Sequence, residues 1–126
     1  MPRIGDRIQE TDWKKENPAP VIECTEQVKV EPAFEVKVSL GKEIAHLNTT
    51  EHHIAWISLY EKYIHAVGGY EFAAHGESTE GPNLGSVYFH HEVTAHLKIM
   101  KTGTLHTVAY CNLHGLWESF KDIHAV

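Results

Sequence analysis

Residues 34–40 alternate apolar and polar side chains, and this pattern limits the fold more strongly than any other feature of the chain. One face of an extended strand would carry four apolar residues, namely Phe34, Val36, Val38 and Leu40. A period of two is typical of a strand that buries one face and exposes the other. We therefore expect this segment to pack against an apolar core.

Several other segments are rich in β-branched and aromatic residues and are separated by turn-forming residues. We expect strands at residues 21–22, 55–60, 67–74, 87–100 and 104–111, and a loop at residues 76–85. No long segment shows a capped helical period. Six or seven short strands with regular turns predict an all-β fold, an immunoglobulin-like antiparallel β-sandwich of about seven strands with an N-terminal arm.

The length of 126 residues is that of one domain. Residues 1–20 are polar and end near two prolines, so we expect an N-terminal arm there and a single β-sandwich domain over residues 21–126. The formal net charge of −6 argues against binding to nucleic acid. The first residues lack the apolar stretch of a secretory signal, and no apolar run approaches the roughly 18 residues of a membrane span. We therefore expect a cytoplasmic protein that binds no membrane.

Cysteine and histidine residues form two clusters. Cys111 and His114 lie three positions apart, and His46, His52 and His53 lie in one predicted loop. A thiolate with several imidazoles suits a transition metal, whereas Mg²⁺ and Ca²⁺ prefer oxygen donors. Both clusters border predicted strands, and loops at one end of a sandwich lie close together, so the clusters can converge. The alternative is that Cys111 is a small buried apolar side chain and that the histidines form a polar loop.

The other histidines and cysteines have simpler interpretations. There are 11 histidines, and most are expected at the surface or in satisfied core positions. The two cysteines, Cys24 and Cys111, are too few for a centre with four thiolates or for a disulfide scaffold. The candidate site is therefore limited to the clustered residues.

Two segments resemble motifs of a known family. Residues 41–54 and residues 110–118 are similar to the central and C-terminal motifs of the superoxide reductases, which include neelaredoxin and the iron domain of desulfoferrodoxin. Residues 12–14, 71–78 and 81–83 also match, so the resemblance extends from about Asp12 to Glu118. The resemblance implies an immunoglobulin-like β-sandwich that holds one iron ion by four equatorial histidines and one axial cysteine.

The matching positions assign a ligand set to this chain. The resemblance implies that His46, His52 and His114 are equatorial ligands and that Cys111 is the axial thiolate. One iron per chain would alternate between Fe²⁺ and Fe³⁺, and superoxide would bind at the open sixth position. His53 and His75 match family positions that are not usually ligands.

The arm departs from the family pattern. The family usually reads Glu-Lys-His-Val-Pro, whereas residues 16–20 read Glu-Asn-Pro-Ala-Pro. Glu16 matches the glutamate that can occupy the sixth position, so we expect it to act as a sixth ligand or in the proton path. Asn17 replaces the lysine that attracts superoxide, and Lys14, Lys15 and Lys42 are the candidates to replace that charge. Pro18 replaces a metal-binding histidine, so water, Glu16 or another histidine must supply the fourth equatorial ligand.

The resemblance also implies a reaction and partners. Superoxide, one electron and two protons would give hydrogen peroxide, with the Cys111 thiolate favouring peroxide release. An external electron donor such as rubredoxin is expected, because the chain lacks the additional four-cysteine domain of some relatives. A homo-oligomer, possibly a tetramer, is also implied.

Two other interpretations fit part of the sequence. Three histidines and one cysteine could enclose Zn²⁺ in a tetrahedron, which would make the chain a degenerate family member with a zinc-bound or metal-free structural role. Pro18 favours this alternative. A cupredoxin-like electron-transfer protein would also combine a sandwich with a Cys-His loop, but it would normally place an axial methionine after the second histidine. No methionine follows His114.

Overall fold

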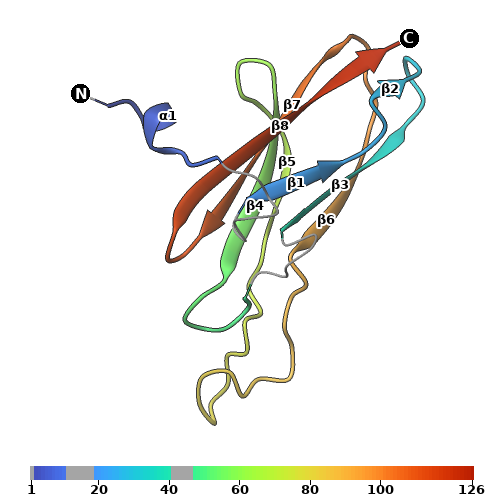
Figure 1. Cartoon of the computed structure of the whole chain (residues 1–126). Coiled ribbons are helices and arrows are strands. Elements are labelled where there is room, and N and C mark those ends of the chain that lie inside the picture. The colour runs from blue at the N-terminus through green and yellow to red at the C-terminus, as the bar shows by residue number, and fades with distance from the viewer. Residues whose placement is uncertain (1, 11–18, 41–46) are drawn as a thin grey trace.

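Two β-sheets enclose one apolar core in the computed structural model of the chain (Figure 1). The structure describes residues 2–10, 19–40 and 47–126. The elements in these ranges are α1 (Ile4–Arg7), β1 (Pro20–Glu23), β2 (Gln27–Val28), β3 (Phe34–Leu40), β4 (Ile54–Glu61), β5 (His65–Glu71), β6 (Glu92–Leu97), β7 (Gly103–Cys111) and β8 (Gly115–Ala125). One sheet has the strand order β1-β3-β6, and the other has the order β2-β8-β7-β4-β5.

The core lies between the inward faces of the two sheets. Residues that are fully buried come from both sheets and include Val36, Val38, Ile57, Ala109 and Ile123. The alternation predicted over residues 34–40 is confirmed, because β3 has the same bounds and buries Val36, Val38 and Leu40. The structure therefore confirms the predicted β-sandwich.

The longest strand, β8, was not predicted from the sequence. Inward and outward positions alternate along β8, as in other strands that bury one face. Two of the inward positions hold the polar residues Ser119 and Lys121, which pair with buried residues of β7. The ammonium group of Lys121 donates a hydrogen bond of 2.7 Å to the backbone carbonyl of Cys24. Phe120 is on the outward face and is 63% exposed. This mixture removes the apolar period of two by which a strand is recognised.

Two other elements differ from the sequence prediction. The strand expected over residues 87–100 is limited to β6, because the residues before β6 pair with the segment that follows β5: Tyr88 forms a β-bridge with His75, and Phe89 donates to the carbonyl of Ala74. The short strand β2 pairs in parallel with β8, although the sandwich was expected to be antiparallel. The two-residue length of β2 gives no periodic signal in the sequence.

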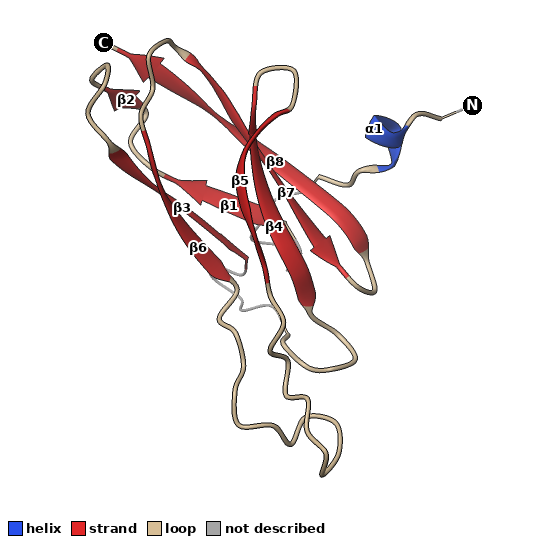
Figure 2. Cartoon of the chain, turned by 180° about the vertical axis from the view of Figure 1, so that it is seen from behind, coloured by secondary structure: helices blue, strands red, loops and turns tan. Residues whose placement is uncertain are grey.

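A long loop, residues 72–91, joins β5 to β6 and extends beyond the lower end of the sandwich in Figure 2. It includes the loop predicted at residues 76–85. The loop folds back on itself, and the amide of Gly85 donates to the carbonyl of Gly76 at 2.9 Å. Gly76 has a φ of +89°, and a Cβ there would lie 2.5 Å from the hydroxyl oxygen of Tyr88. Only glycine fits this turn without displacing Tyr88.

The N-terminal residues are attached to the five-stranded sheet by Gln9. The backbone of Gln9 accepts from the amide of Glu118 at 2.8 Å and donates to the carbonyl of Leu116 at 3.0 Å, beside the start of β8. Helix α1 buries none of its residues. The division into an arm over residues 1–20 and a domain over residues 21–126 stays a prediction, because residues 11–18 lie outside the described part. Within the described ranges, no helix has the length and apolar character needed to cross a membrane.

The strand register brings the two Cys/His clusters to one end of the sandwich. In the antiparallel pair of β4 and β7, Ile54 at the start of β4 lies opposite Cys111 at the end of β7. His52 lies two positions before the first residue of β4, and His114 lies in the turn that leads from β7 to β8. Residues that precede β4 and residues that follow β7 therefore meet at this end of the sandwich.

Candidate metal centre

Three donor side chains converge at the end of the sandwich where β4 begins and β7 ends. The ligand atoms of His52, Cys111 and His114 all lie within 4.8 Å of one another. The sulfur of Cys111 is 3.7 Å from Nδ1 of His114, and the rings of His52 and His114 meet edge to face with centroids 4.9 Å apart. Metal bonds to nitrogen and sulfur of about 2.1–2.3 Å allow donors of one ion to lie up to about 4.5 Å apart. The three side chains therefore fit a single ion after small adjustments.

A tight hairpin places Cys111 beside His114. Cys111 pairs with Gly115 across the turn, so only residues 112–114 connect β7 to β8. Gly115 has a φ of +84°, a conformation that favours glycine and is typical of a short hairpin loop of this kind. We call residues 111–115 the Cys-His turn. The proximity of Cys111 and His114 follows from residues within the turn itself, and Gln9 supports the turn from outside by donating to the carbonyl of His114.

The other ligand, His52, lies in a segment without regular structure, residues 47–53, which we call the ligand segment. Within it, Thr49 and His52 form a turn, because the amide of Thr49 donates to the carbonyl of His52 and the amide of His52 donates to the Thr49 hydroxyl, both at 3.0 Å. This turn aims His52 toward the sandwich, where it is half-buried.

Asn112 links the ligand segment to the Cys-His turn. Its side-chain oxygen accepts from the amide of His53 at 2.8 Å, and its side-chain nitrogen donates to the carbonyl of Glu51 at 2.8 Å. Its backbone amide donates to the carbonyl of His53 at 3.1 Å. These three bonds join Asn112, which follows Cys111, to Glu51 and His53, the two residues that flank His52. Sequence analysis missed Asn112; its position inside the Cys-x-x-His motif was the only available signal.

The long loop holds the ligand segment from the opposite side. The side-chain oxygen of Asn83 accepts from the amide of Thr50 at 2.7 Å, and its nitrogen donates to the Glu51 carboxylate at 2.8 Å. The bond from Asn83 is the main reason that the pKa of Glu51 lies below its usual range. His75 of the same loop stacks on His53, with ring centroids 3.6 Å apart. The ligand segment is thus held by side chains distant in sequence.

The described donors suit metal binding at neutral pH. Burial, followed by the nearby His114 and His53, lowers the pKa of His52 below that of a free histidine. A histidine binds a metal ion only in its neutral form, so this shift favours coordination. Cys111 is fully buried, whereas His114 is exposed. Among the described donors, His114 is therefore the one that is accessible to solvent.

The structure brings together three of the four predicted ligands, and the remaining site residues lie outside the described part of the chain. These are His46 among the ligands, Glu16 as the expected catalytic residue, and the departures at Asn17 and Pro18. The lysines named as candidate attractants, at positions 14, 15 and 42, are also outside it. Their roles stay predictions.

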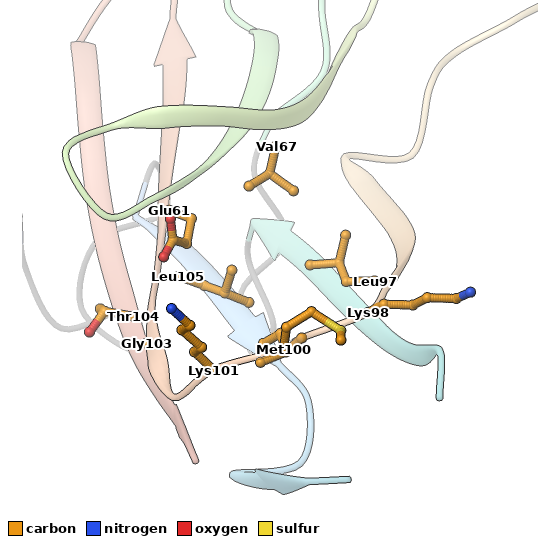
Figure 3. Close-up of a pocket in the computed structure, with 10 residues that line it drawn as sticks. Glu61, Val67, Leu97, Lys98, Met100, Lys101, Gly103, Thr104 and Leu105 are labelled. Atoms are coloured by element: carbon orange, nitrogen blue, oxygen red, sulfur yellow. The ribbon is translucent and has the colours of Figure 1, made fainter. Parts of the chain in front are cut away.

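An apolar cavity of about 310 Å³ lies at the other end of the sandwich (Figure 3). Glu61 at the end of β4 and Leu105 near the start of β7 line it, and these two residues pair across the strands. Figure 3 shows Val67, Leu97 and Met100 around the same space. None of its lining residues belongs to the His/Cys/His group, so the cavity is separate from the candidate metal centre.

A β-sandwich that carries a His/Cys/His group at one end defines a class of candidate mononuclear metal proteins. The chain belongs to the desulfoferrodoxin family, because the family model described as Desulfoferrodoxin matches residues 10–120. This confirms the resemblance seen in the sequence. The fold and donors of the described residues agree with this membership.

Individual relatives support the same assignment over nearly the whole chain. Neelaredoxin from Megalodesulfovibrio gigas is 52% identical over 126 residues, covering 96% of this chain and 97% of the relative. Superoxide reductase from Pyrococcus furiosus is 46% identical over 121 residues, covering 92% and 95%. Among solved structures, one from Thermotoga maritima has a TM-score of 0.96 and 46% identity, covering 100% of this chain and 99% of the other. The reduced form of superoxide reductase (neelaredoxin) from Archaeoglobus fulgidus has a TM-score of 0.84 and 46% identity, covering 93% and 98%.

Proposed function

We propose that this chain is a superoxide reductase, an oxidoreductase that adds one electron and two protons to superoxide and releases hydrogen peroxide. The observation that carries this proposal is the convergence of His52, Cys111 and His114 in a member of the desulfoferrodoxin family. Relatives of similar length and 46% identity are named superoxide reductases. The comparisons support this activity over the two alternatives weighed from the sequence.

The metal that fits these donors and the family is iron, one ion per chain, held by His46, His52, His114 and Cys111. Iron, when bound, supplies the single electron by changing between Fe²⁺ and Fe³⁺. Two of the proposed iron ligands are the half-buried, neutral imidazole of His52 and the fully buried sulfur of Cys111. Because His114 is exposed, a small anion can approach the centre from solvent without passing through the core.

The arm is proposed to complete the centre. Glu16 is the proposed sixth-position or proton-path residue, by its match to the family glutamate. Pro18 has no side-chain donor, so the fourth equatorial position falls to water, Glu16 or another histidine. Attraction of superoxide would depend on nearby lysines, because Asn17 carries no charge.

We further propose an external electron donor of the rubredoxin type and a homo-oligomeric state such as a tetramer. The chain has two cysteines, Cys24 and Cys111, and Cys24 alone cannot hold a second redox iron. A cytoplasmic location stays a prediction from the sequence.

A comparison of the two cysteines tests the proposed function. Protein produced with iron supplied should contain about one iron per chain, and its ferrous form should be oxidised by a pulse of superoxide with formation of hydrogen peroxide. Oxidised protein should show a visible absorption from thiolate-to-iron charge transfer. Cys111→Ser should remove this absorption, because Cys111 is the proposed ligand. Cys24→Ser is the matched control, because it removes the other thiol, and it should leave both signals unchanged.

Two results would reject the proposal. One is stoichiometric zinc with little iron in protein produced with both metals available, which would favour the structural zinc alternative. The other is an unchanged rate of reaction with superoxide in Cys111→Ser. Strong blue absorption with copper and none with iron would instead favour an electron-transfer protein of the cupredoxin type.

A further inference from the structure

The long loop, residues 72–91, contains two buried histidines, and one of them, His75, contacts both ends of the ligand segment. His75 is only 4% exposed, although it lies outside the strands. A buried imidazole normally has partners for its ring nitrogens, because an unmatched polar atom in the interior is costly. The partners of His75 therefore show what the residue holds in place.

The first partner is Asn48, near the start of the ligand segment. Nδ1 of His75 lies 2.5 Å from the side-chain oxygen of Asn48 and donates to it in the tautomer that carries its hydrogen on Nδ1; Nε2 lies 2.8 Å from the carbonyl oxygen of Phe72. The side-chain nitrogen of Asn48 donates to the carbonyl of Phe89 at 2.6 Å, which fixes the orientation of the amide. Asn48 is thus held by His75 and Phe89, which lie at the two ends of the long loop.

The second partner is His53, at the end of the ligand segment. The rings of His53 and His75 are nearly parallel, with an angle of 7° and a centroid distance of 3.6 Å. His53 is fixed in its plane because its Nδ1 lies 2.8 Å from the carbonyl oxygen of Thr49. Stacking at this distance limits rotation of the residue that directly follows His52.

His75 is itself held in place by the loop. Its backbone amide donates to the Glu77 carboxylate at 2.7 Å, and its β-bridge to Tyr88 joins the two sides of the loop. Gly76, which adopts a left-handed conformation, allows Tyr88 to lie against this turn. The ring is therefore supported by the loop rather than by the sheets.

We propose that His75 is a positioning residue that orients His52 toward Cys111 and His114 by holding Asn48 and His53 at the two ends of the ligand segment. This inference rests on the proposed metal centre, but it does not depend on the reaction catalysed there. His75 is not assigned as a metal ligand. Partners that orient metal ligands commonly change metal affinity by about 10–100-fold when they are removed.

Cobalt binding tests the positioning role without measuring activity. Metal-free protein is titrated with Co²⁺ alone at neutral pH, and binding is followed by the thiolate-to-cobalt absorption. His75→Phe keeps a flat ring for stacking but loses both polar contacts, and we expect it to weaken binding roughly 10-fold. Asn48→Ala removes the acceptor and should cause a similar loss. His75→Gln can still donate to Asn48 and should recover part of the affinity.

The matched control is His106→Phe, the same substitution in a half-buried histidine of β7 that contacts the ring of Phe120 instead of the ligand segment. It should leave Co²⁺ affinity unchanged within about twofold, far below the effect of removing a ligand-orienting group. The double variant of His75 and Asn48 should lose no more affinity than the more affected single variant, because the two substitutions remove the same contact.

The proposal is overturned if His75→Phe binds Co²⁺ as tightly as His106→Phe, or if the losses of His75→Phe and Asn48→Ala add in the double variant. If His75→Phe does not fold, as judged by circular dichroism, Asn48→Ala carries the same expectation alone. If the variants bind Co²⁺ more weakly but the unsubstituted protein does not reduce superoxide, the proposed function is rejected and the positioning role is retained. In the iron-loaded protein, a shift of the reduction potential in His75→Phe, absent in His106→Phe, would be further support.

Discussion

The Cys-His turn and the ligand segment provide donors to the same candidate centre, but they obtain their shapes in different ways. The turn is defined by residues within five positions, through the pairing of Cys111 with Gly115 and the left-handed conformation of that glycine. The ligand segment is held by side chains 22 to 61 positions away, in the long loop and in the turn. A site can thus combine a locally determined half with a half that depends on the completed fold, and the two halves should respond differently to substitution.

The largest effect is expected where the two halves are joined, at Asn112. Asn112→Ala removes two side-chain bonds to the ligand segment, and we expect Co²⁺ affinity to fall by up to about 100-fold. Asn83→Ala is the comparison, because it loosens only the ligand segment and should cause a smaller loss. Titration of metal-free proteins with Co²⁺ measures both. Equal losses in the two variants would show that the link between the halves has no special importance.

The next largest effect is expected in the long loop, which supports the ligand segment. Gly76→Ala would place a methyl group 2.5 Å from the Tyr88 hydroxyl in a left-handed conformation, and we expect a loss of about 2–4 kcal/mol in the free energy of unfolding. Urea unfolding of the metal-free protein measures this loss in the free energy of unfolding. Gly5→Ala is the control, because no atom lies within 4 Å of a Cβ built there. A loss below 1 kcal/mol, on the scale of an ordinary surface substitution, would contradict the prediction.

A smaller effect is expected within the Cys-His turn. Gly115 has a φ of +84°, but the nearest atom to an added Cβ is 3.9 Å away, so only the conformational cost applies. Gly115→Ala should therefore lower the free energy of unfolding by about 1–2 kcal/mol. The same urea measurement compares it with Gly76→Ala. A larger loss for Gly115→Ala than for Gly76→Ala would show that the turn is the less tolerant of the two regions.

The smallest effect is expected from acidification. Burial lowers the pKa values of His52 and of His75, which is also faced by His53, His91 and the Glu77 carboxylate. The unfolded chain therefore binds more protons than the folded chain just below the normal histidine pKa of about 6.5. Stability of the metal-free protein should be constant above this pH and fall as the pH decreases below it. Urea unfolding between pH 7.5 and 5.5 measures this slope, which His75→Gln should reduce; an unchanged slope in His75→Gln would contradict the prediction.

The sequence predicted those parts of the structure that have a local pattern. β3 was found with its correct bounds because its apolar residues alternate strictly, whereas β8 was missed because Ser119 and Lys121 take inward positions. The convergence of Cys111 and His114 with His52 was expected from their types and positions. The supporting contacts of Asn112 and His75 were not predicted, because a hydrogen bond between distant side chains leaves no spacing pattern. His46 and Glu16 lie outside the described residues, and their roles stay predictions.

Because Gln9 is anchored to the sandwich, the arm residues that follow it can be substituted as a unit. Gln9 is tied to the first residues of β8, and its side chain also donates to the carbonyl of His114. Ala19 is almost fully buried, and Pro20 of β1 pairs with Leu40 of β3. The described residues on either side of the intervening stretch are therefore attached to the sheets. Writing lysine and histidine into positions 17 and 18 is then a graft of unchanged length, and it offers a direct way to rebuild the family's usual metal-binding sequence on this scaffold.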